Sequence, residues 1–109
     1  MSKFDDKVAM YSAEMKKLGI KADHDLLVAC TKACGPSIYN ADAETVSGSD
    51  QKELDRVKKN FLVKKLGFSE SDDLDGMVDA AVNAMGKSNR KKYRAIFYTF
   101  LAAKAGKTP

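Results

Sequence analysis

The stretch SNRKKYRAIFYTFLAAK, residues 88–104, decides the fold of this chain. Its apolar side chains recur every three or four residues, which is the period of a helix that buries one face. Ser88 is a residue type that caps helices, so we expect the helix to begin there. The stretch therefore predicts an amphipathic helix over 88–104 whose buried face carries Tyr93, Ile96, Phe97, Phe100 and Leu101.

Four earlier segments show the same period, and each favours a helix: 4–18, 23–34, 50–66 and 72–85. A glycine follows the end of each, where a left-handed residue commonly stops a helix. No segment alternates apolar and polar residues with the period of two typical of a half-buried strand. The chain is therefore predicted to be all-α, a compact single domain (1–109) of about five helices with an irregular segment over 36–49.

Capping residues indicate where these helices begin. Asp50 would cap the third helix, and Glu53, three residues later, completes the pattern of a capping box. Ser69 or Ser71 would begin the fourth helix. Within the irregular segment, Asp42 would cap one short turn.

Basic residues gather at the start of the predicted last helix. Residues 86–109 hold seven basic residues and no acidic one, whereas residues 66–85 hold five acidic residues and no basic one. Unpaired amides at a helix start favour negative charge, so we expect this cluster to face either an external anion or carboxylates of the preceding helix. The predicted anion-binding residues are Lys87, Ser88, Asn89, Arg90, Lys91 and Arg94. The internal partners would be Asp72, Asp73, Asp75 and Asp79.

Two other surfaces are candidates for binding. A basic face of the third helix would be either plain solvated surface or a docking face for an acidic partner; it carries Lys52, Arg56, Lys59 and Val63. Lys58 lies instead among apolar positions, from which its amine would reach water or an aspartate. In the irregular segment, polar residues would form either structural caps or a small polar pocket; they are Tyr39, Asn40 and Asp42.

No residue set for catalysis, a metal or a cofactor is complete. Cys30 and Cys34 are too few for a four-ligand zinc site, and His24 is the only histidine, so both cysteines are predicted to pack in the core. The segment AVNAMGKS (81–88) resembles a phosphate-binding loop but lacks its first glycine and the preceding strand. A calcium loop around Gly76 would have a valine where glutamate is required. We therefore expect no catalytic residues, no metal and no cofactor.

The N-terminal residues MSKFDDKVAM contain acids where a signal peptide needs an apolar run. No stretch is long and apolar enough to span a membrane. Two cysteines suit a reducing compartment. We expect a cytoplasmic protein that has no membrane partner.

Three stretches together resemble a small bacterial family catalogued only as a domain of unknown function: GPSIYNADAE (35–44), DRVKKNFLVKKLG (55–67) and GKSNRKKYRAIFYTFL (86–101). GPSIYNAD and KSNRxKYRAxFY are its motifs, the second being the more specific. The resemblance implies a compact all-helical fold, with two helix–loop–helix pairs arranged like an EF-hand without calcium. It implies no reaction and supplies no active-site residues. Cys30 and Cys34 depart from the family pattern, which favours packing for both.

These patterns favour a non-enzymatic interaction module that binds a protein partner or a second copy of itself. The alternative is a binder of anions or nucleic-acid backbones through the basic start of the last helix. Such a binder would lose affinity steeply with salt. Tyr93 speaks against this alternative, because its spacing places it in the core rather than on a surface where bases stack.

Overall fold

The computed structural model describes residues 3–89 and 91–109. Within these residues it holds six α-helices, five of them at least seven residues long, and no strand. This confirms the predicted compact all-α fold, while the EF-hand-like pairing stays a prediction. The helices are α1 (Lys3–Leu18), α2 (His24–Cys34), α3 (Ala41–Glu44), α4 (Gln51–Val57), α5 (Leu74–Met85) and α6 (Arg94–Ala105), with a 3₁₀ segment η1 (Gly35–Tyr39) and a π-helical segment η2 (Lys58–Val63).

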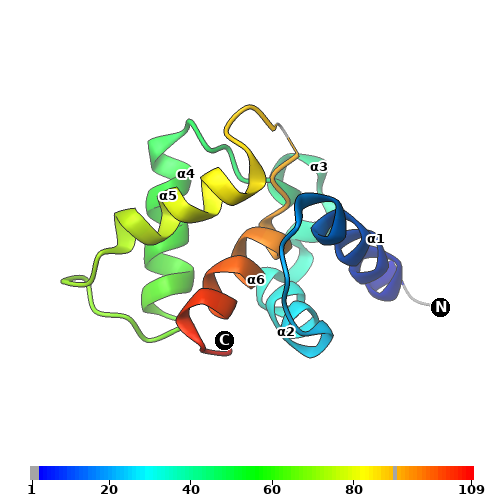
Figure 1. Ribbon diagram of the computed structural model, residues 1–109, viewed down its shortest axis with the longest axis horizontal. Helices are drawn as coiled ribbons and strands as arrows, with labels where there is room; N and C mark the ends of the chain where they lie inside the picture. Colours follow the sequence, from blue (N-terminus) through cyan, green and yellow to red (C-terminus); the bar gives the residue numbers. More distant parts are fainter. Residues whose placement is uncertain (1–2, 90) are drawn as a thin grey trace.

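Helix α6 lies at the centre of the molecule. In Figure 1 it runs between α1 and α2 on one side and α4 and α5 on the other. It packs against α1, α2, α3 and α5. A helix covered on several sides must be apolar around most of its circumference, and α6 buries Ala95, Ile96, Phe97, Tyr98, Thr99, Leu101 and Ala102. Phe100, which we expected in the core, is only half-buried.

The predicted start of the last helix at Ser88 is wrong, because α6 begins at Arg94. Helix α5 ends at Met85 and is capped by Gly86, whose φ of 90° lies in a region that favours glycine. The chain then approaches the 45–46 segment: Val46 N donates to Lys92 O at 2.7 Å, and Thr45 forms an isolated antiparallel bridge with Tyr93. Tyr93 is extended, with φ −60° and ψ 131°, and α6 begins only after these backbone contacts.

The segment expected to be irregular, 36–49, contains most of η1 and all of α3. Asn40 caps α3, since its side-chain oxygen accepts from the amide of Asp42 at 3.0 Å. The expectation that Asp42 caps this turn is therefore wrong, whereas a capping role for Asn40 is confirmed. Thr45, directly after α3, is extended.

The helix predicted over 50–66 is built as α4 continued by η2. Asp50 caps α4 by accepting from Lys52 N at 3.0 Å, as expected. Glu53 does not close a capping box, because its carboxylate binds two arginines instead. Helix α5 begins at Leu74 rather than near 72, and its cap is Asp73 instead of Ser69 or Ser71.

We predict that Phe97→Ala lowers the free energy of unfolding by about 3–5 kcal/mol, because Phe97 is fully enclosed in the core and its removal leaves a cavity. Phe100→Ala is the matched control on the same helix, and the half-buried ring should contribute less, on the order of 1 kcal/mol. Urea titration followed by circular dichroism measures the free energy of unfolding of both variants. Equal losses for the two variants would contradict the assignment of α6 as the central helix.

Candidate functional site

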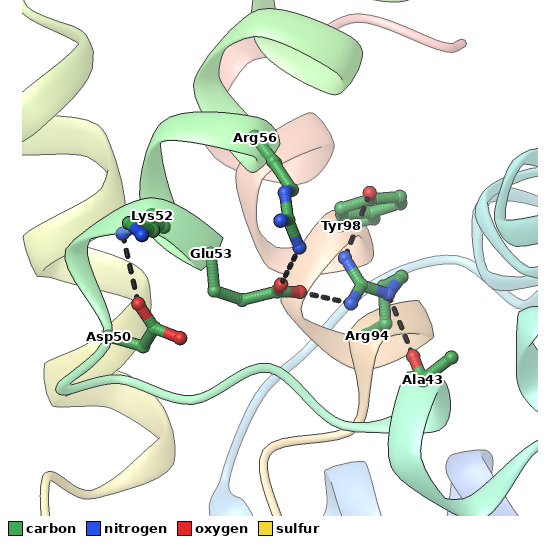
Figure 2. A network of polar contacts seen from close by, with 7 residues as sticks. All are labelled: Ala43, Asp50, Lys52, Glu53, Arg56, Arg94 and Tyr98. Carbon is green, nitrogen blue, oxygen red and sulfur yellow. Dashed lines mark hydrogen bonds and ion pairs between the residues drawn. The ribbon is translucent and has the colours of Figure 1, made fainter.

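An arginine–glutamate network links three helices (Figure 2). Arg94, the first residue of α6, forms an ion pair with Glu53 of α4 and donates from Nε to the carbonyl of Ala43 in α3 at 3.0 Å. The side chains of Arg94 and Glu53 are only 15% and 14% exposed. Glu53 also accepts from the exposed Arg56 at 3.4 Å.

The surroundings of Arg94 keep it charged. Burial by itself would lower the pKa of Arg94, but hydrogen bonds to Tyr98 and Glu53 outweigh this effect and raise the pKa above its ordinary value. The ring of Tyr98 is in turn stacked on Phe61, with 3.9 Å between ring centroids. Arg94, which we predicted to face an anion, is therefore bound inside the fold.

The loop before α6 is organised by a buried lysine. Lys92 is 3% exposed, and its Nζ donates to the carbonyls of Lys87 at 3.0 Å and Asn89 at 2.5 Å. Burial lowers the pKa of Lys92. Asn89 binds Met85 O and Lys91 N, so its amide shapes the loop.

Of the six predicted anion-binding residues, Lys87, Ser88 and Lys91 are exposed. Asn89 and Arg94 serve internal contacts, and Arg90 lies outside the described residues.

Three of the four aspartates of the 72–79 region contact groups outside the basic cluster. Asp72 accepts from Ser69 N at 2.8 Å, and Asp73 caps α5. Asp75 forms an ion pair with Lys58, whose pKa is raised by this hydrogen bond. We expected the Lys58 amine to reach water or an aspartate, and it pairs with Asp55 and Asp75. The carboxylate that forms an ion pair with Arg94 belongs to Glu53, and not to one of the four aspartates we expected.

A polar cleft of about 570 Å³ brings two of the predicted sites together. Asp42 from α3 lies in the same cleft as Lys87, Ser88 and Asn89, which are far from it in sequence. Tyr39 is exposed and does not line the cleft, and neither does Asn40. The remaining lining residues are Thr45, Val46, Ser47, Ser49, Asp50 and Glu53.

Among the described residues, the lining of the polar cleft holds three carboxylates and one lysine, and one of the carboxylates, Glu53, is already paired with Arg94 and Arg56. Its hydroxyl, carboxylate and ammonium groups can therefore hydrogen-bond a polar group. His24, the only histidine of the chain, lines a different depression beside α1.

The basic face predicted on the third helix is only partly exposed. Lys52, Arg56 and Lys59 are exposed, and Arg56 pairs with Glu53. Val63 is half-buried and packs against the core, so it is not a free apolar contact on this face.

A largely apolar groove along α5 and α6 was missed from the sequence. It consists of two depressions of about 590 and 580 Å³ that share Phe100 and Lys104. We call it the α5–α6 groove. Its apolar lining includes Ile20, Phe68, Met77, Ala80, Ala84 and Phe100. One feature of the sequence could have indicated this groove. Helix α6 has more apolar positions than one buried stripe requires, so some of them must lie at the surface.

A second buried polar cluster joins α1 to α3. Glu44 is 8% exposed, accepts from the Tyr11 hydroxyl at 2.5 Å and pairs with Lys7 at 2.8 Å. Burial and the contact with Glu44 raise the pKa of Tyr11. The ring of Tyr11 lies against Tyr93, with 5.2 Å between centroids. The cluster therefore fixes the first helix against the loop that leads into α6.

The two cysteines are free thiols that pack inside the fold. Cys30 is fully buried and Cys34 is half-buried. Burial raises the pKa of Cys30 to about 11 and that of Cys34 to about 12, which suppresses the reactive thiolate at neutral pH.

Within the part of the chain that the structure describes, no three His, Cys, Asp or Glu side chains converge as metal ligands. None of the helices described there is long and apolar enough to cross a bilayer.

We predict that Glu53→Gln lowers the free energy of unfolding by about 2 kcal/mol, because it leaves the charge of Arg94 enclosed without its partner. A double-mutant cycle with Arg94→Ala should give a coupling energy of about 1–3 kcal/mol. Arg56→Ala is the control, since its 68% exposed side chain should contribute within about 0.5 kcal/mol. A coupling energy near zero by urea titration would contradict the structural role of the pair.

We further predict slow alkylation of Cys34. Because its raised pKa lies far above neutral pH, its reaction with iodoacetamide at pH 8 should be on the order of 100-fold slower than that of an unstructured cysteine peptide. Mass spectrometry of timed samples measures the rate. The same protein in denaturant is the control and should react at the ordinary rate. A native rate equal to the denatured one would show that the thiol is not enclosed.

Comparison with known families agrees with the resemblance drawn from the motifs. No curated protein sequence matches the chain at a significant level. The family model described as "Protein of unknown function (DUF2853)" matches residues 10–109, a range that includes both GPSIYNAD and the basic motif before α6. The chain therefore belongs to the DUF2853 family of proteins of unknown function.

Proposed function

We propose that this protein is a non-enzymatic protein-interaction module that binds its partner in the α5–α6 groove. The observation that carries the proposal is the lining of this groove. Met77 and Phe100 are half-buried and Ala80 is exposed, so apolar surface faces solvent in a concave site. A partner that covers this apolar surface would gain about 25 cal/mol per Å² that it buries.

The state of the reactive groups supports a role without catalysis. The thiols of Cys30 and Cys34 have raised pKa values because they are buried. The Lys92 amine is held by two backbone carbonyls, and the Tyr11 hydroxyl by Glu44. An active site needs such groups exposed to a substrate in a pocket, whereas here packing encloses them.

The second candidate is a binder of anions or of nucleic-acid backbones. The exposure of Lys87, Ser88 and Lys91 favours it. Against it, the polar cleft beside Lys87 also contains carboxylates, and Arg94 is bound to Glu53. Backbone binding would show a steep fall of affinity with salt, so titration of labelled DNA and RNA at low and high salt distinguishes the two candidates.

A photo-crosslinking amino acid placed at Ala80 tests the interaction module. Ala80 is exposed and lines the groove, so ultraviolet light applied to living cells should give a discrete covalent adduct with another protein. Adding Ala103→Glu on the opposite wall should abolish this adduct, because it places bulk and charge in the groove.

The matched control carries the same crosslinker at Asn60, an exposed position in η2 that does not line the groove. Adducts of equal yield from both positions, or none from Ala80, would contradict the proposal. Sedimentation velocity of the purified protein separates binding of another protein from self-association, since a second copy in the groove would give a dimer.

A further inference from the structure

The walls of the α5–α6 groove suit a partner segment whose backbone is helical. Both of its main walls are helices, whose interior amides and carbonyls are already hydrogen-bonded within the helix. Such walls cannot add a strand through main-chain hydrogen bonds. A partner segment that satisfies its own backbone, namely a helix, fits this surface without leaving buried polar groups.

Small residues on both walls allow a helix to approach closely. Ala80 is exposed and Ala84 half-buried on α5, and Ala103 is exposed on α6. Phe100 lies between the two depressions and belongs to both. Apolar side chains spaced by three and four residues along one face of a partner helix would therefore contact Phe100 and its neighbours.

One lysine amine lies near each of two aromatic rings of the groove. The Lys104 amine lies 5.8 Å from the centroid of Phe100, and the Lys107 amine lies 4.5 Å from that of Phe68. Lys21 lines the far end of the groove. Among the residues that the structure describes, no carboxylate lies within ion-pairing distance of these three amines. Asp73 is the single acidic residue of the described lining.

We propose that the occupant of the α5–α6 groove is an amphipathic helix of a partner protein, with an apolar face flanked by carboxylates. This inference rests on the proposed function and names the chemistry of the partner. The apolar face packs on Phe100 and Met77, and the carboxylates pair with Lys104, Lys107 and Lys21. Because these charges lie at the edge of the groove, the pairing selects the partner and speeds its association more than it adds affinity.

The test is a helix-biased peptide library displayed on phage and selected on the purified full-length protein. Selected peptides should carry apolar residues at helical spacing and an excess of Asp and Glu beside them. Fluorescence anisotropy then measures the dissociation constant of the peptide that binds most tightly. Lys104→Glu and Ala103→Glu should each weaken its binding by about 10-fold or more, since one reverses an attractive charge and the other obstructs the groove.

Lys64→Glu is the matched control, because it makes the same charge change at an exposed residue outside the groove. It should change the dissociation constant by less than about 3-fold, as expected for a remote surface charge. Equal weakening by Lys64→Glu and Lys104→Glu would overturn the proposal, because attraction would then depend on net charge alone. Selected peptides that are basic, or that lack helical spacing, would also overturn it.

These outcomes separate the inference from the proposed function. An adduct at Ala80 together with selected peptides of another chemistry would support the proposed interaction module. It would contradict the proposal that the partner segment is an acidic amphipathic helix. A dimer in sedimentation that Ala103→Glu dissociates would assign the groove to a second copy, and would equally overturn the inference. Without adducts at Ala80 and without selected peptides, both proposals fail.

Discussion

The ion pair between Glu53 and Arg94 holds together parts of the chain that are far apart in sequence. The guanidinium of Arg94 binds the carboxylate of Glu53 and the carbonyl of Ala43 at once, so α6, α4 and α3 meet at one residue. Both charges are largely enclosed, and a partly buried charge is tolerated only while its partner is in place. This contact therefore helps to fix the start of α6 against α3 and α4, while the buried apolar residues of α6 pack against α2 and α5.

The same contact decides the chemistry of the surface around it. Because Arg94 points into the fold and Lys92 donates to two loop carbonyls, two basic side chains near the start of α6 are withdrawn from solvent. Lys87 then faces a cleft that also contains Asp42 and Asp50. A segment that is strongly basic in sequence thereby borders a cleft whose described lining contains both carboxylates and a lysine.

The groove on the other side of α6 follows from how the helices pack. Residues such as Ile96 and Phe97 are fully covered by neighbouring helices, whereas Phe100 lies where α5 and the 18–21 segment leave a gap. The half-buried ring of Phe100 and nearby alanines remain partly accessible there, with lysine amines near the rings of Phe100 and Phe68. The interior thus continues to the surface as an apolar groove, and this is where we place the binding of a partner helix.

The sequence by itself determined the helical class, the approximate extent of most helices and several of their ends, because apolar spacing and glycine stops act locally. It also identified Asp50 as a cap, and left open whether the Lys58 amine reaches water or an aspartate. Only the tertiary structure decided that Glu53 binds Arg94 instead of closing a capping box, and that residues 92–93 pair with 45–46 instead of starting a helix. Both outcomes depend on partners more than 40 residues away in sequence, which local propensity does not encode. The partial exposure of Phe100 likewise depends on where other helices end.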